Sequence, residues 1–115
     1  MFGFTTISID AKGRLAIPAK YRDHLLSQKE ESIVVTRDPQ YPALKIYPGS
    51  VWNQISTELQ SLQGLDPIVR NLQWTILGNA SVSAFDPSGR MLILLPAELR
   101  EYAEIHKTEK VALIG

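Results

Sequence analysis

Apolar and polar residues alternate over Thr5–Ile9, which is typical of a strand with one buried face. The short apolar stretch Leu15–Ile17 predicts a second strand that returns alongside the first. Between them, Asp10 suits the first position of a type I turn, and Gly13 tolerates positive φ three residues later. The pattern therefore predicts a hairpin whose turn is formed by Asp10 and Gly13.

Farther along, the spacing of apolar residues predicts short helices and two more strands. Pro18 suits the first position of a helix, and Pro96 repeats that start. The expected elements are a helix with Tyr21, Leu25 and Leu26 inward, strands over Ile33–Thr36 and Leu44–Tyr47, a helix after a Ser50 cap with Val51, Ile55, Leu59 and Leu62 inward, and a helix capped by Asp66 and Pro67 with Ile68, Leu72 and Ile76 inward. The tryptophans Trp52 and Trp74 are expected in the core or at an interface rather than on a ligand.

The chain also contains an internal duplication. Asp10–Arg22 recurs as Asp86–Arg100, and each copy reads Asp-x-x-Gly-Arg, then an apolar run, then Pro-Ala-x-x-Arg. The second copy therefore predicts the same turn, formed by Asp86 and Gly89. Its run from Gly89 to Pro96 is two residues longer than the first, which predicts a bulge or an extended strand there.

The duplication divides the chain into a first repeat over residues 1–50, a helical linker over 51–78 and a second repeat over 79–115. A unit of this size rarely holds a core alone, so the halves are expected to fold against each other or against another subunit. Position 115 corresponds to position 37, so the second repeat lacks a counterpart of Leu44–Tyr47 and Val51–Leu62. We therefore expect a C-terminally shortened chain with a strand edge that favours another subunit.

Composition narrows the class of protein. Lys and Arg number 12, as do Asp and Glu, so an anionic partner needs a local basic patch rather than net charge. The segment up to Lys29 is such a patch, with five basic residues against two acidic ones. Cysteine is absent, and no signal peptide or membrane span is visible, so a soluble cytoplasmic protein with no membrane partner is expected.

The repeated arginines are the candidate binding residues. Arg14 and Arg90 directly follow the turn glycines, where each guanidinium can form a bidentate pair with guanine O6 and N7. Lys12, Lys20 and Arg22 are better suited to phosphate oxygens. The alternative is that these arginines pair with carboxylates inside the fold or at a subunit contact, and that the two turn aspartates only cap the backbone.

Catalysis has little support in the sequence. His24 and His106 stand alone, no carboxylate cluster has metal-ligand spacing, and no glycine-rich phosphate loop precedes a helix. Ser88 lies next to Gly89 without the glycines of a nucleophile elbow. We therefore expect a non-enzyme with no metal, no cofactor and no small-molecule substrate.

These residues resemble the MraZ family, whose members carry two SpoVT/AbrB-type looped-hinge DNA-binding repeats. The segments that carry the resemblance are Asp10–Pro18 with Tyr21 and Arg22, Leu77–Ala80, Asp86–Arg90 and Leu99–Ala103. The resemblance implies an α+β fold in which duplicated SpoVT/AbrB-like β-hairpin units form a small interlocked β-barrel with short helices and a helical linker. The arginine usual after Met-Phe in the family is absent from Met1–Phe4.

The resemblance also implies a function. It points to a sequence-specific regulator, normally a repressor of the bacterial division and cell-wall gene cluster. Such a protein binds tandem G-rich repeats in double-stranded DNA, as a ring-shaped homo-oligomer in the cytoplasm, associated with the nucleoid. The rival hypothesis is an oligomeric assembly or protein-binding module in which DNA binding is weakened or lost.

Overall fold

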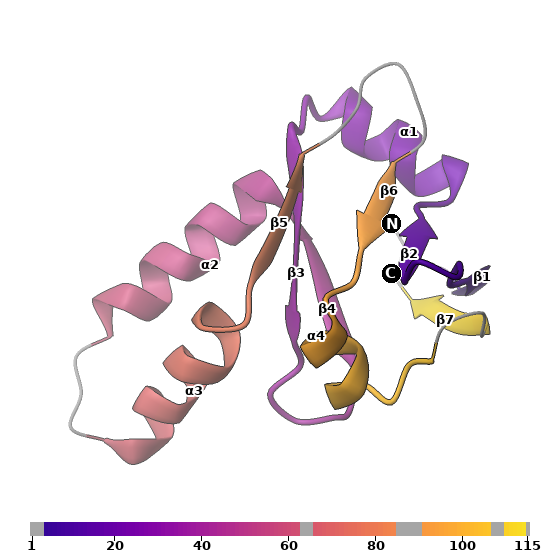
Figure 1. The fold of residues 1–115 in the computed structure, drawn as a ribbon. Coiled ribbons are helices and arrows are strands. Elements are labelled where there is room, and N and C mark those ends of the chain that lie inside the picture. The colour runs from indigo at the N-terminus through magenta and orange to yellow at the C-terminus, as the bar shows by residue number, and fades with distance from the viewer. Residues whose placement is uncertain (1–3, 63–65, 85–90, 107–109, 115) are drawn as a thin grey trace.

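The protein is a small α+β fold. The computed structural model describes residues 4–62, 66–84, 91–106 and 110–114. In chain order, the elements are β1 (Phe4–Ser8), β2 (Arg14–Ala16), α1 (Ala19–Ser27), β3 (Ser32–Arg37), β4 (Leu44–Pro48), α2 (Gly49–Ser61), α3 (Pro67–Leu77), β5 (Ser81–Ala84), β6 (Leu92–Leu94), α4 (Ala97–Tyr102) and β7 (Lys110–Ile114) (Figure 1). The predicted strands and helices are all present, with ends shifted by one or two residues.

Strands from the two ends of the chain pair with each other. β1 pairs with β7, β2 with β6, and β3 with both β4 and β5, and all four pairings are antiparallel. Each of the three sheets thus contains a strand that precedes α2 and a strand that follows α3. The closed barrel that the resemblance implies is not confirmed, because the ladders of the described residues stop at these three sheets. The predicted hairpin of β1 and β2 is wrong in its strand pairing: these two strands are linked by an isolated bridge between Ile9 and Leu15, and each forms its ladder with a strand from the other end of the chain.

A local two-fold relation centres on the β2–β6 ribbon. Leu15 lies opposite Ile93 in this ladder. The Leu95 amide donates to the Gly13 carbonyl at 3.0 Å, and the Ile17 amide donates to Met91 at 2.9 Å in the symmetric position. The relation therefore places Met91 where the first copy has Gly13. β6 itself contains no bulge, so the two additional residues of the second copy fall before Met91.

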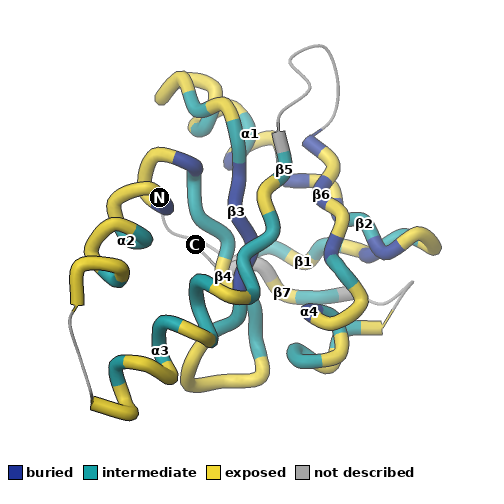
Figure 2. Tube along the Cα trace, turned by 60° about the vertical axis from the view of Figure 1, so that its left-hand side comes forward, coloured by how far each residue is buried: buried dark blue, intermediate teal, exposed yellow. Residues whose placement is uncertain are grey.

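The core lies under the inner face of this ribbon. Inward and outward positions alternate along β6: Ile93 is 2% exposed, whereas Leu92 and Leu94 are 39% and 54% exposed. Figure 2 shows this alternation of blue and yellow on β6. The buried cluster consists of Ile9, Leu15, Ile17, Tyr21, Ile33, Val35, Met91, Ile93, Leu95 and Leu99. Both copies of the repeat therefore contribute to one core.

The helix starts differ in detail from expectation. Pro18 and Pro96 are the caps that precede α1 and α4, with extended ψ of 147° and 149°, rather than the first helical residues. The same holds at α2, which follows Pro48, so Ser50 lies inside the helix instead of capping it. The expected cap of α3 is confirmed, because the Asp66 carboxylate accepts a hydrogen bond from the Ile68 amide at 2.9 Å.

The inward faces of the helices are narrower than predicted. In α2, Trp52 is buried and its ring lies 5.9 Å from that of Tyr47, while Val51 is 39% exposed. In α3, Ile68 and Trp74 are 71% and 73% exposed. Leu26 and Leu62, also predicted inward, are exposed.

The arrangement of the elements explains these differences. α2 and α3 lie on the side of β3 away from β2 and β6, so each helix meets the fold along one edge only (Figure 1). The hydroxyl of Thr36, for example, donates to the Ile76 carbonyl and ties one end of α3 to β3. Trp74 is 73% exposed and is therefore not a core residue. Of the two places predicted for it, core or interface, the interface stays a prediction. No helix in the described parts of the chain is long and apolar enough to span a membrane.

Candidate nucleic-acid interface

The first turn is held by backbone bonds and by one carboxylate. The Gly13 amide donates to the Asp10 carbonyl at 3.0 Å, and Gly13 has a φ of 80°. One carboxylate oxygen of Asp10 accepts hydrogen bonds from the backbone amides of Lys12 at 2.9 Å and Arg14 at 2.8 Å. Four residues are thus fixed in a tight hairpin turn, with the Lys12 side chain exposed at its tip.

Arg14 projects from the outer face of the ribbon, directly after this turn. Its Nε donates to the second carboxylate oxygen of Asp10 at 2.9 Å, and the two side chains remain 37% and 40% exposed. The alternative of an ion pair within the fold is therefore realised. Exposed ion pairs of this kind add little to stability, so its main effect is to orient the guanidinium. Arg14 lies opposite Leu94, with its side chain half-buried.

The same contacts lower the pKa of Asp10 from its usual value of 3.8. The backbone amide of Arg14 is the largest cause, and the Arg14 side chain and the Lys12 amide act in the same direction, while desolvation opposes them. A carboxyl with a lowered folded-state pKa stabilises the fold fully above its unfolded-state pKa. That contribution is lost as the pH falls below about 4 toward the folded-state value.

We therefore expect the free energy of unfolding of Asp10→Asn to fall less than that of the wild type as the pH drops below about 4. Asparagine keeps an oxygen for the two backbone amides but cannot titrate. The variant should be slightly less stable than the wild type at pH 7, and the gap should shrink or vanish at pH 3. Urea unfolding at both pH values measures this, with Glu58→Gln on the exposed face of α2 as control. An equal gap at both pH values would contradict the assigned role of the carboxylate.

Arg100, which was not among the candidate binding residues, contributes to the first turn. Its Nε donates to the Leu95 carbonyl at 3.0 Å. A Cβ added to Gly13 would lie 3.0 Å from that nitrogen and 3.1 Å from Cζ. The guanidinium therefore lies directly against the turn glycine. The repeated Pro-Ala-x-x-Arg spacing was the available signal, because it fixes this arginine one helical turn after Pro96.

Lys20 and Arg22 lie elsewhere on the fold. They follow β2 at the end away from the turn, at the start of α1. The Lys20 ammonium is 5.0 Å from the centre of the Tyr21 ring, and Arg22 Nε is 3.8 Å from an Asp23 carboxylate oxygen. The structure thus groups Lys12, Arg14 and Arg100 at the first turn and leaves Lys20 and Arg22 apart from them.

The second turn falls outside the described residues, so Asp86, Gly89 and Arg90 cannot be placed. The β2–β6 ribbon nevertheless shows where the two copies of the motif differ. Because Met91 takes the place of Gly13, Leu92 takes the place of Arg14 on the outer face. The described outer face of the ribbon therefore carries one arginine with apolar neighbours, not a symmetric arginine pair.

Other chemistry finds little support in the part of the chain that the structure describes. Within residues 4–62, 66–84, 91–106 and 110–114, no three His, Cys, Asp or Glu side chains are grouped closely enough to hold a metal ion. His24 lies on α1, beside an open groove with apolar walls. The arrangement at the first turn suits the binding of an anion through rigidly held cationic groups.

Comparison with known proteins adds a family to this geometry. A family model described as "MraZ protein, putative antitoxin-like" matches residues 1–73. A Transcriptional regulator MraZ of Nitrosomonas europaea is 50% identical over 113 residues, which cover 98% of this chain and 73% of the relative. Proteins of the same name from Pseudomonas fluorescens and Pseudomonas putida are 42% and 43% identical, over 98% of this chain and 72% of each relative. The chain is shorter than these relatives.

Proposed function

The chain belongs to the MraZ family, and from this premise we propose that it is a sequence-specific, DNA-binding transcriptional regulator. The observation that carries the proposal is Arg14, held outward by Asp10 directly after a rigid turn. We further propose that it represses the division and cell-wall gene cluster. In this proposal it acts in the cytoplasm, at the nucleoid, and is not an enzyme.

Arg14 is the proposed base reader. Asp10 bonds to Nε of the guanidinium, so the two terminal nitrogens can face guanine O6 and N7 as a bidentate pair. The turn and the bond to Asp10 already order Arg14, which limits the conformational entropy that is lost on binding. Asp10 thus orients the Arg14 guanidinium, and its carboxylate also balances part of the arginine charge until DNA is bound.

The remaining cations have supporting roles in this proposal. Lys12, exposed at the tip of the turn, would contact phosphate. Lys20 and Arg22, at the start of α1, would contact phosphates of the DNA backbone. The hydrogen bond from the Ile17 amide to the Met91 carbonyl puts that helix start beside β6. We also propose Arg90 as a base contact, on the repeated motif alone.

Affinity would come from several weak contacts made together. The formal net charge is zero, so nonspecific attraction of the whole chain to DNA is small. A homo-oligomer, ring-shaped in this proposal, would place several turns at the spacing of tandem G-rich repeats. Each later contact would then form at a high effective concentration.

One observation favours the alternative of an assembly or protein-binding module. Ile68 and Trp74 expose large apolar side chains on α3, where a protein contact could cover them. This alternative does not need Arg14. The two hypotheses therefore differ in what happens to DNA binding.

The test is binding of the purified chain to duplex DNA with tandem G-rich repeats, compared with a scrambled duplex of equal length, over a salt series. We expect preference for the repeats and an affinity that falls steeply with salt. Equal binding to both duplexes, or no binding at low salt, would contradict the regulator and favour the assembly module.

A further inference from the structure

The outer face of the β2–β6 ribbon carries exposed leucines beside Arg14. Leu94 lies directly opposite Arg14 in the ladder. Two positions along, Leu92 lies opposite Ala16, which is also exposed. Opposite residues of an antiparallel ladder point to the same side of the sheet, so all four side chains share one face. Leu94 is 54% exposed and Leu92 is 39% exposed. Ala16, Leu92 and Leu94 thus form an apolar strip next to the arginine.

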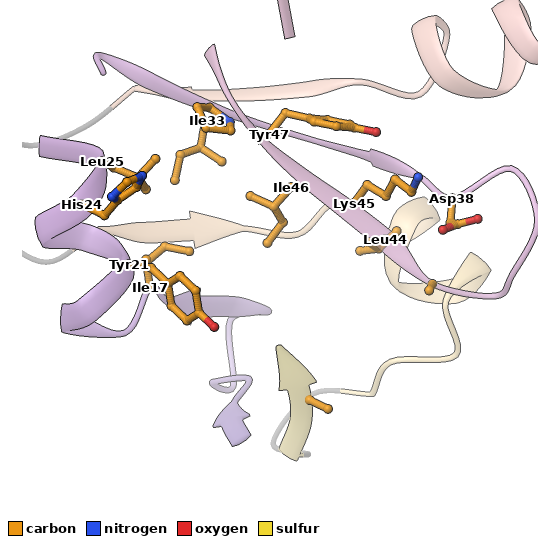
Figure 3. A pocket seen from close by; sticks show the side chains of 13 residues that line it. Ile17, Tyr21, His24, Leu25, Ile33, Asp38, Leu44, Lys45, Ile46 and Tyr47 are labelled. Carbon is orange, nitrogen blue, oxygen red and sulfur yellow. The ribbon is translucent and has the colours of Figure 1, made fainter. Parts of the chain in front are cut away.

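The rest of the described fold leaves this apolar strip open. α2 and α3 lie on the side of β3 away from β2 and β6 (Figure 1). The groove beside His24, into which Tyr21 and Ile46 point (Figure 3), has no lining residue from β6. In the first copy, the segment after β3 forms β4 and α2, which contact β3 and each other. By the local two-fold relation, the same segment of a second copy would lie against β7 and away from the ribbon.

The charges around the apolar strip favour a nucleic acid over a protein as its occupant. Lys12 and the ion pair of Asp10 with Arg14 lie at the same end of the ribbon. Lysine and aspartate are depleted in the cores of protein interfaces. The major groove of B-DNA, in contrast, is about 12 Å wide and admits a two-stranded β-ribbon. A face that combines cations with an apolar strip therefore suits the floor of that groove.

The base edges in the major groove offer leucine one kind of contact. Adenine, guanine, cytosine and thymine all present hydrogen-bonding groups there, and thymine also presents a 5-methyl group. Leucine has no donor or acceptor, so the methyl group is the feature of these edges that it can recognise. Removing both apolar groups from water makes the contact favourable.

We propose that Leu94 is a specificity-determining residue that contacts the 5-methyl group of a thymine within two base pairs of the guanine bound by Arg14. This inference rests on the proposed DNA binding. The Cβ atoms of directly opposite residues are about 4.5–5.5 Å apart, and successive base pairs are spaced about 3.4 Å along the duplex. The two side chains therefore reach base pairs one or two steps apart. Arg14 reads a hydrogen-bonding edge, and Leu94 reads a methyl group beside it.

The test replaces thymine by deoxyuridine, one position at a time, in a duplex of tandem G-rich repeats whose guanine runs are flanked by A·T pairs. Deoxyuridine keeps the base pairing and the O4 acceptor and lacks only the methyl group. We expect one sensitive position in each repeat, where loss of the methyl group lowers the affinity about fourfold per repeat bound. 7-Deazaguanine, which lacks the N7 acceptor, identifies the guanine that Arg14 reads, and the sensitive thymine should lie within two base pairs of it.

Protein variants assign the effect to the leucine. Leu94→Ala should bind the thymine duplex at least as weakly as the wild type binds the deoxyuridine duplex, and should not respond to the deoxyuridine substitution. Its response to 7-deazaguanine should persist, because Arg14 and its bond to Asp10 remain. Its melting temperature should stay close to that of the wild type, since the Leu94 side chain is already half-exposed. Leu62→Ala, at an exposed leucine next to the end of α2, is the matched control and should respond like the wild type.

The outcomes separate this inference from the function on which it rests. A preference for the repeats that responds to 7-deazaguanine but not to deoxyuridine would overturn the thymine contact and leave the DNA-binding proposal standing. Loss of the 7-deazaguanine response in Leu94→Ala would also overturn it, because Leu94 would then act only by positioning Arg14. No preference for the repeats would overturn both.

Discussion

Replacing Arg14 by alanine is expected to abolish the preference for G-rich repeats and to leave the fold almost unchanged. A bidentate arginine–guanine pair discriminates by about 1–3 kcal/mol, so removing each such pair should reduce the preference roughly 5- to 150-fold. In an oligomer these reductions multiply across the copies that bind one DNA molecule. Competition binding with repeat and scrambled duplexes at fixed salt measures the effect.

Stability should change little in this variant, because the turn does not need the guanidinium. The Asp10 carboxylate still accepts hydrogen bonds from the backbone amides of residues 12 and 14, and the exposed ion pair that the substitution removes adds little to stability. Arg14→Lys keeps the charge without the planar fork, so it should retain salt-dependent binding and lose discrimination. Arg70→Ala, on the exposed face of α3, is the neutral control. A large fall in melting temperature would make Arg14 structural.

Replacing Gly13 by valine is expected to damage both fold and DNA binding. A φ of 80° costs a residue with a side chain about 1–2 kcal/mol, and more when the side chain is β-branched. The new Cβ would also press on the Arg100 guanidinium and weaken its bond to the Leu95 carbonyl. Hydrogen bonds from charged donors contribute about 1.5–3 kcal/mol. Together, a loss on the order of 3 kcal/mol in the free energy of unfolding is expected from urea titration.

Two variants separate these causes. Gly13→Asn should cost less than Gly13→Val, since asparagine tolerates the left-handed region. Gly13→Val in an Arg100→Ala background tests the contact, because a double-mutant cycle should show coupling between the two positions. Full stability of Gly13→Val would contradict both the turn geometry and the contact.

Local signals in the sequence were sufficient for most elements. Asp66 followed by Pro67 marked the start of α3, because a side-chain cap and a fixed φ act within a few residues. Alternation identified β1, and the spacing of Asp10 and Gly13 predicted the turn that the structure contains. Each of these features depends on neighbours in the chain, which a single sequence displays. The predicted pairing of the two strands that flank the turn was wrong, because β1 pairs with β7 and β2 with β6.

Features that depend on distant partners could not be predicted in the same way. Ile68 and Trp74 follow a helical spacing, but their exposure is decided by the single edge along which α3 meets β3. The register of β6 became clear only from two hydrogen bonds, from the Leu95 amide to the Gly13 carbonyl and from the Ile17 amide to the Met91 carbonyl. They show that the motif alignment and the spatial alignment of the two copies differ by two residues. The contact between Arg100 and Gly13 arises from the same crossing of the two halves.

The pairing of β1 with β7 and of β2 with β6 has a consequence for how the chain acquires its structure during synthesis. The N-terminal strands leave the ribosome first, yet their hydrogen-bonding partners are made last. β3 and β4 with the following helices are close in sequence and can form early, at low cost in loop closure. The first turn, with Arg14 on it, should therefore become rigid only after translation has passed β6, so nascent chains would not compete with finished ones for DNA.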